Sequence, residues 1–302
     1  MPSTSITILM VIFSLMSLAA MLQNGFVIAV LAREWMRSRK LSAAEMIVAS
    51  LASSRFCLHG TAVLNDLLAF FGFCYQANFL GIFWDFSNTL LLWFTACLAI
   101  FYCVKISSFS HPALSWLKWR ISRLVPRLLL GSLVLGSLSA IISATGNIIA
   151  TRMIISQGSR GNCTLGHKTL AFFWYYYLFH IALLWLTPFF LFLLSIILLM
   201  SSLYRHVGQM RNQRTGTCDP STQAHTMALK FLAFFFIFYI LFFLSMTISI
   251  MKTTTMQSYW YWAKEIIIYV GVYLHSIILV LSNPKLSKAL KTRLQNLCAA
   301  TS

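Results

Sequence analysis

Three acidic residues beside long apolar runs are the residues best suited to recognise a ligand. The chain has only six Asp and Glu among 302 residues, and Asp66, Asp85 and Glu265 are three of them. Ionised groups within or beside a membrane-spanning run are costly and usually face a polar interior or water. Together, these three carboxylates could attract a cationic ligand. The alternative is that they are interface residues solvated by water.

A tryptophan and an asparagine add a second recognition element next to Asp85. Trp84 and Asn88 are four residues apart, so they lie on the same face of a helix. An indole ring next to an amide gives an apolar wall with one oriented donor and acceptor, which suits a small-molecule site. The alternative is a tryptophan that packs at the membrane interface.

A single arginine lies in the middle of an apolar run and needs polar partners. We predict that Arg55 joins a buried network with Asn24 and with the region of Ser282 and Asn283, which are polar groups at comparable depth. Such a network either stabilises the fold or switches between two arrangements of the helices.

A fourth polar position is His180, in the same run as Pro188. Proline is tolerated in membrane helices and often kinks them. His180 is either a hydrogen-bonded structural residue or a residue that lines the ligand site.

The elements that position these side chains are expected to be helices embedded in lipid. The chain is 59% hydrophobic, only 10% charged, and has a mean hydropathy of +0.78. Soluble domains are about 45–50% apolar and about 25% charged. The net charge of +17 does not indicate nucleic-acid binding, because the basic residues form short blocks between apolar runs.

Seven apolar runs are long enough to cross a bilayer as helices, which need about 20 residues. We therefore predict an all-α membrane protein, a seven-transmembrane-helix bundle forming one domain over residues 1–302. The predicted spans are 6–32, 42–70, 83–106, 124–150, 176–203, 227–251 and 261–282, and the tail is 283–302.

The charged blocks predict the orientation of the bundle. Seventeen Lys and Arg fall in the loops and tail that would be cytoplasmic, against five on the other side. This excess places the N-terminus outside and the C-terminus inside. Asp66, Asp85 and Glu265 then lie near the outer ends of their spans, which suggests an outward-facing polar cavity.

Two further features agree with this orientation. Asn162 begins a glycosylation sequon, Asn-Cys-Thr, in the predicted outer loop between spans four and five. Residues 285–297 have leucines on one helical face and basic residues on the other, which predicts a short amphipathic helix on the cytoplasmic membrane surface. Cys298 at its end is either palmitoylated or an unmodified cysteine.

Several short motifs resemble those of the bitter taste receptors, the type 2 taste receptor family of G-protein-coupled receptors. The resemblance runs along the whole chain, with the motifs in the family's order. They are the asparagine motif 24–27, the Leu-Ala-Ser-Ser-Arg motif 51–55, the end of span three at 101–110, the Leu-Lys-Trp-Arg motif 117–120, the entry to span six at 219–230 and the exit of span seven at 275–286.

The resemblance implies a receptor that binds bitter small molecules from outside and activates a gustducin-type heterotrimeric G protein. It implies a multi-pass plasma-membrane protein, with no cofactor and no metal. It leaves oligomerisation open. The ligand-binding candidates are Trp84, Asn88, Glu265, Asp66, Asn65, Asp85, His180 and Phe242, the activation network is Asn24, Arg55 and Ser282, and the G-protein-facing candidates are Tyr102, Lys105, His225 and Lys230.

Other classes of membrane protein fit the sequence less well. A transporter would show repeated halves or broken helices, and an enzyme would show a catalytic motif. A retinal protein needs a lysine deep in the last span, whereas Lys264 lies at its outer end. The nearest alternative is another chemosensory seven-helix receptor, such as a vomeronasal pheromone receptor, which would share the fold.

Overall fold

The computed structural model describes residues 4–71, 74–106, 112–156, 178, 180–213, 220–250 and 259–301. Regular structure in these ranges is helical throughout. The chain divides into two compact units: the first is Met1–Asn88 with Lys252–Ser302, and the second is Thr89–Met251. The long helix α3 contributes to both.

The helices follow the apolar runs and usually extend beyond them. Seven of those within the described ranges are long and apolar enough to cross a membrane, which confirms the predicted seven-helix bundle. The element order is α1 (Thr4–Ser38), α2 (Ala43–Phe70), α3 (Cys74–Ile106), α4 (Pro112–Ser156), η1 (Ile181–Trp185), α6 (Leu186–Gln213), α7 (Pro220–Ile250), α8 (Tyr259–Ser282) and α9 (Pro284–Thr301).

Several helices begin or end away from the predicted span boundaries. Helix α3 begins before residue 83, α4 before residue 124, and α7 before residue 227. The predicted boundaries marked where charged or polar residues interrupt the apolar run. A helix does not have to end there, because its backbone hydrogen bonds continue into the polar membrane surface and water.

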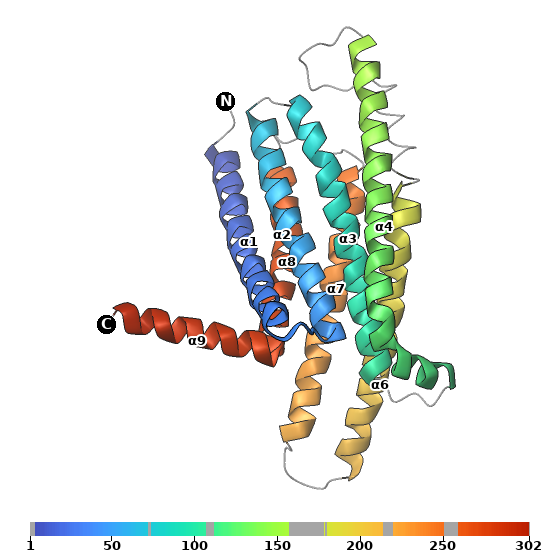
Figure 1. The fold of residues 1–302 in the computed structure, drawn as a ribbon. Helices are drawn as coiled ribbons and strands as arrows, with labels where there is room; N and C mark the ends of the chain where they lie inside the picture. The colour runs from blue at the N-terminus through green and yellow to red at the C-terminus, as the bar shows by residue number, and fades with distance from the viewer. Residues whose placement is uncertain are drawn as a thin grey trace. The chain divides into compact units, whose positions relative to one another are not determined.

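In the first unit, α1 packs against α2 and α8 (Figure 1). Phe13, Ala20 and Leu31 form a buried stripe on α1. Close approach between α1 and α2 is possible because Gly60 has no side chain. A Cβ at Gly60 would come within 3.3 Å of the Met21 side chain.

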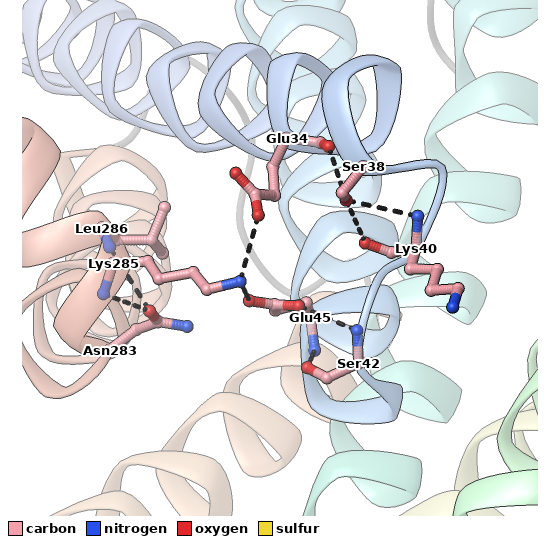
Figure 2. A network of polar contacts seen from close by, with 8 residues as sticks. All are labelled: Glu34, Ser38, Lys40, Ser42, Glu45, Asn283, Lys285 and Leu286. Carbon is pink, nitrogen blue, oxygen red and sulfur yellow. Dashed lines mark hydrogen bonds and ion pairs between the residues drawn. The ribbon is translucent and has the colours of Figure 1, made fainter.

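The turn between α1 and α2 is held by local hydrogen bonds. Helix α1 closes at Arg39, which has a positive φ of 53° and donates its backbone N–H to the Trp35 carbonyl at 2.8 Å. Helix α2 then begins with a capping box. The Ser42 N–H donates to the Glu45 carboxylate at 2.8 Å, and the Glu45 N–H donates to the Ser42 hydroxyl at 3.3 Å (Figure 2).

Helix α9 starts immediately after α8 and leaves it at a steep angle (Figure 1). Asn283 caps it, since its side-chain oxygen accepts from the backbone N–H groups of Lys285 and Leu286 at 3.0 and 3.3 Å. Pro284 occupies the first helical position, where its missing N–H costs nothing. The predicted tail helix is therefore present, and it is longer than 285–297.

An ion-pair cluster joins the start of α9 to α1 and α2. The Lys285 ammonium lies 2.9 Å from the Glu45 carboxylate and 3.4 Å from the Glu34 carboxylate (Figure 2). The hydrogen bond with Glu45, followed by those of Glu34, raises the pKa of Lys285 above 10.5. Lys285 therefore keeps its charge across the physiological range, and the contacts weaken when alkaline pH removes that proton or acidic pH protonates the two glutamates.

In the second unit, a proline leaves one backbone carbonyl without its usual N–H donor, and a tryptophan side chain donates to it instead. Pro188 has no N–H to donate to the Leu184 carbonyl, one helical turn earlier. The Trp93 indole N–H donates to that carbonyl instead, at 3.1 Å. The π-helical segment η1 contains this carbonyl, as expected where the regular helical hydrogen-bond pattern is interrupted.

Candidate functional site

The predicted site residues of α2, α3 and α8 lie within the first unit. Asp66 and Asp85 are buried, with 5% and 3% of their surface exposed. Asn65 and Glu265 are half-buried. The carboxylates of Asp66 and Glu265 are close enough to interact electrostatically. Asp66 and Glu265, from different helices, therefore lie near one another, as predicted for these two of the three acids.

Each of these two acids has a partner from α8. The Tyr261 hydroxyl donates to the Asp66 carboxylate at 3.0 Å. The Lys264 ammonium lies 3.3 Å from the Glu265 carboxylate and 5.1 Å from the Tyr261 ring centroid. Lys264 thus offsets one of the acidic charges, so the site is less negative than its acids alone would suggest.

Trp84 is fixed by a tyrosine that the sequence reasoning did not single out. Its indole N–H donates to the Tyr269 hydroxyl at 2.7 Å. The Tyr269 ring makes edge contacts with Phe13 and with His59, at centroid distances of 5.2 and 5.1 Å. Tyr269 therefore connects α1, α2, α3 and α8. The aromatic composition of the last span was a visible signal for such a role.

Asn88 is a buried polar side chain with unsatisfied hydrogen-bonding groups. It has no exposed surface, and neither its amide nitrogen nor its amide oxygen has a hydrogen-bond partner in the described part of the chain. A buried amide normally makes hydrogen bonds, and an unsatisfied one costs about 1–3 kcal/mol. One turn from the fixed Trp84, it offers a donor and an acceptor to a ligand.

We use the name binding cluster for Asp66, Trp84, Asp85, Asn88, Glu265 and Tyr269. Its chemistry is that of recognition. It combines aromatic faces, carboxylates and one amide, and the described residues contain no group of His, Cys, Asp or Glu that could hold a metal ion.

The predicted network around Arg55 is present, with different α8 partners. Arg55 is 2% exposed, donates to the Ser276 hydroxyl at 2.8 Å, and contacts the His275 ring. Ser276 in turn donates to the Asn24 side chain at 3.3 Å. Ser282, by contrast, is exposed. The predicted pairing of Arg55 and Asn24 therefore runs through Ser276, which the sequence analysis did not select.

The two remaining ligand-binding candidates lie in the second unit. His180 is 1% exposed, and its ring nitrogen Nε2 lies 2.7 Å from the Ser139 hydroxyl. The Thr89 hydroxyl donates to Ser139 at 2.9 Å, so His180 belongs to a polar group inside this unit. Phe242 is also buried and stacks on Tyr239 at 6.4 Å.

The G-protein-facing candidates also belong to the second unit. Tyr102 and Lys105 are half-buried near the end of α3, and Lys230 is exposed on α7. His225 also lies in α7. Asn162, the predicted glycosylation site, lies outside the described residues.

Seven helices of membrane-spanning length in the described part of the chain indicate a multi-pass membrane protein. Comparison with known proteins identifies its family. A family model described as "Taste receptor protein (TAS2R)" matches residues 1–298.

Similar proteins are also named as type 2 taste receptors. "Taste receptor type 2 member 143" of Rattus norvegicus is 72% identical over 293 residues, which cover 97% of this chain and 100% of that protein. The protein of the same name in Mus musculus is 68% identical over 293 residues, with the same coverage of 97% and 100%. "Taste receptor type 2 member 16" of Homo sapiens is 39% identical over 282 residues, 93% of this chain and 96% of that protein.

The chain therefore belongs to the taste receptor (TAS2R) family. It is a bitter taste receptor, a G-protein-coupled receptor of the plasma membrane, and not an enzyme. This outcome confirms the resemblance found in the sequence motifs and decides against the alternative of a vomeronasal receptor.

Proposed function

We propose that this receptor binds amphipathic bitter molecules, cationic ones in particular, at the binding cluster, and that it activates a gustducin-type heterotrimeric G protein. The observation that carries the proposal is Asn88, a fully buried amide without a hydrogen-bond partner in the described chain. It lies one turn from Trp84, whose ring is held in place by Tyr269. A ligand could hydrogen bond to the Asn88 amide and stack on the Trp84 ring at the same time.

The charge of the cluster supports the preference for cations. Lys264 is paired with Glu265. Asp66 is hydrogen bonded by neutral side chains, the Tyr261 hydroxyl and Asn65. Among Asp66, Glu265 and Lys264, two carboxylates therefore face one ammonium, and a ligand with a protonated amine would find an unbalanced negative charge in a region of low dielectric constant.

The signal would pass from this cluster to the basic residues that the charge pattern predicts to be cytoplasmic. We propose that the N-terminus is outside and that Tyr102, Lys105, His225 and Lys230 face the G protein. His180 and Phe242 stay ligand-binding candidates on the strength of the resemblance. A ligand shifts the receptor only by its different affinity for two states, and the Arg55 network is our candidate for an element that differs between them.

The receptor function is tested by calcium release in cells that co-express this chain with a gustducin-type chimeric G protein. A panel of bitter compounds should contain agonists with a dose-dependent response. Trp84→Ala and Asn88→Ala should raise the half-maximal agonist concentration at least tenfold at equal surface expression. The matched control is Trp260→Ala on α8, whose side chain is 72% exposed. Equal potency in all four receptors would contradict the proposed site.

The charge preference is tested by removing the acids without changing their shape. Asp66→Asn and Glu265→Gln should weaken cationic agonists by a larger factor than neutral agonists of similar size. The same loss for both kinds of agonist would exclude a role of the acidic charge in selectivity.

A further inference from the structure

The buried guanidinium of Arg55 has no acidic partner in the part of the chain that the structure describes. Its contacts are Ser276 through Nη1 and the His275 ring through Nη2, and both are side chains without a negative charge. None of the ion pairs within the described residues includes Arg55. Arginine stays protonated in proteins, so the first unit contains a buried positive charge with no counter-charge among the described residues. Such a charge is strongly unfavourable in an apolar interior.

The nearest acids along α2 are too far away to neutralise it. Asp66 is eleven residues from Arg55 and Glu45 is ten, which corresponds to about 15–17 Å along a helix. Each is also engaged elsewhere, Asp66 with Tyr261 and Glu45 with Lys285.

Four buried polar atoms of the first unit have no hydrogen-bond partner in the described chain. They are Nε of Arg55, both ring nitrogens of His59, and the hydroxyl oxygen of Ser17. His59 and Ser17 have no exposed surface, and Arg55 is 2% exposed. His59 follows Arg55 by one turn and so lies on the same face of α2.

The contacts of α1 place Ser17 at the level between His59 and Arg55. On one side, Phe13 and His59 both contact the Tyr269 ring, at 5.2 and 5.1 Å. On the other, Asn24 and Arg55 both bond to the Ser276 hydroxyl.

With a rise of about 1.5 Å per residue, Ser17 lies about 6 Å below Phe13 and about 10 Å above Asn24 along α1. Ser17, Arg55 and His59 therefore form one layer of the first unit, at the junction of α1, α2 and α8.

We propose that this layer, Ser17, Arg55 and His59, binds a small monovalent anion of the size of chloride. All three side chains can donate a hydrogen bond to it: the guanidinium through Nε–H, the serine through its hydroxyl, and the neutral histidine through one ring N–H. An anion accepts all of them and supplies the missing counter-charge. A metal cation would be repelled by Arg55, and water would satisfy the donors but leave the charge unbalanced.

The test is the thermal stability of the purified full-length receptor in detergent or nanodiscs, measured without agonist. Sodium chloride replaces sodium gluconate at constant ionic strength and pH, since gluconate is too large for the layer. A ligand that binds only the folded state raises the unfolding temperature with saturation. We expect a rise of roughly 3 °C or more for the wild type, and a similar rise with bromide.

Two conservative variants locate the site. Ser17→Ala and His59→Phe, which keeps an aromatic ring against Tyr269, should each raise the chloride concentration for half the effect at least fivefold. Arg55→Gln should abolish the effect, and if it does not fold, the first two variants carry the test alone. The matched control is Ser14→Ala on the same helix, whose hydroxyl is already bonded to the Met10 carbonyl at 2.9 Å; it should behave as wild type.

Two results would overturn the proposal. One is an unfolding temperature that is the same in chloride and gluconate, which is the behaviour of a layer that holds only water. The other is a chloride effect that Ser17→Ala and His59→Phe leave unchanged, which would place the anion elsewhere. Because the measurement uses no agonist, either result leaves the proposed ligand site and G-protein coupling untouched.

Discussion

At the level of single residues, Tyr269 is the side chain that links the parts of the binding cluster. Its hydroxyl accepts the Trp84 indole N–H, and its ring touches Phe13 and His59. The residue is 1% exposed, so its orientation is set by packing. The orientation of Trp84 therefore depends on one hydroxyl group that can be removed without changing the ring.

We expect Tyr269→Phe to reduce agonist potency while keeping the fold. The ring contacts persist, but Trp84 loses its acceptor, and a hydrogen bond contributes about 0.5–1.5 kcal/mol. The half-maximal agonist concentration should rise roughly two- to twelvefold in the calcium assay. Tyr259→Phe on the same helix, at a side chain that is 53% exposed, should have no effect. A Tyr269→Phe receptor with wild-type potency would show that this hydroxyl does not orient the site.

At the level of helices, the irregular segment before α6 depends on a proline and a tryptophan acting together. Trp93 donates to the Leu184 carbonyl, which is available because Pro188 has no N–H. Replacing Pro188 by alanine would restore a backbone donor for that carbonyl, and the two donors would then compete.

A double-mutant cycle measures this dependence. Trp93→Phe should lower the unfolding temperature of the wild-type receptor, because the buried Leu184 carbonyl loses its donor, at a cost of about 1–3 kcal/mol. In the Pro188→Ala background the same change should cost less than half as much, because the backbone N–H at position 188 takes over. Additive effects of the two substitutions would contradict the assignment.

Helix α9 offers a second test at this level. Asn283 accepts two backbone N–H groups at its start, and loss of such a cap costs about 1 kcal/mol. Asn283→Ala should therefore speed amide hydrogen exchange across the first turn of α9 about fivefold, whereas Asn283→Asp should retain protection. The exposed Thr292, further along the same helix, gives the control Thr292→Ala. Equal exchange in Asn283→Ala and wild type would show that the ion pairs of Lys285 hold the helix without the cap.

At the level of the whole molecule, the sequence predicted the elements better than the contacts between them. Seven apolar runs gave seven helices because lipid requires the backbone to satisfy its own hydrogen bonds. The capping residues Ser42 and Asn283 let α2 and α9 begin close to the predicted positions. Helix ends in other regions were missed because hydropathy does not report where a backbone stops being helical.

The contacts that were missed join residues far apart in the chain. Depth along the spans correctly suggested that Arg55 and Asn24 share a network, but it selected Ser282, which is exposed, in place of Ser276. Depth gives the level of a residue and not the direction in which its side chain points. The role of Tyr269 and the ion pair between Lys264 and Glu265 also depend on helix rotation.

The orientation of the bundle remains a prediction from charge, and it affects every functional proposal above. Seventeen Lys and Arg on one side against five on the other place the tail in the cytoplasm and Asn162 outside. A C-terminal epitope tag should therefore stain only permeabilised cells, and an N-terminal tag should stain intact cells.

Digestion with a glycosidase should increase the gel mobility of the wild-type receptor, and Asn162→Gln should already migrate at the digested position. Because Thr164 is part of the same sequon, Thr164→Ala should reproduce the shift while keeping the asparagine. Staining of the tail in intact cells would show that the bundle has the opposite orientation. The acidic binding cluster would then face the cytoplasm, and the proposed recognition of external ligands would fail with it.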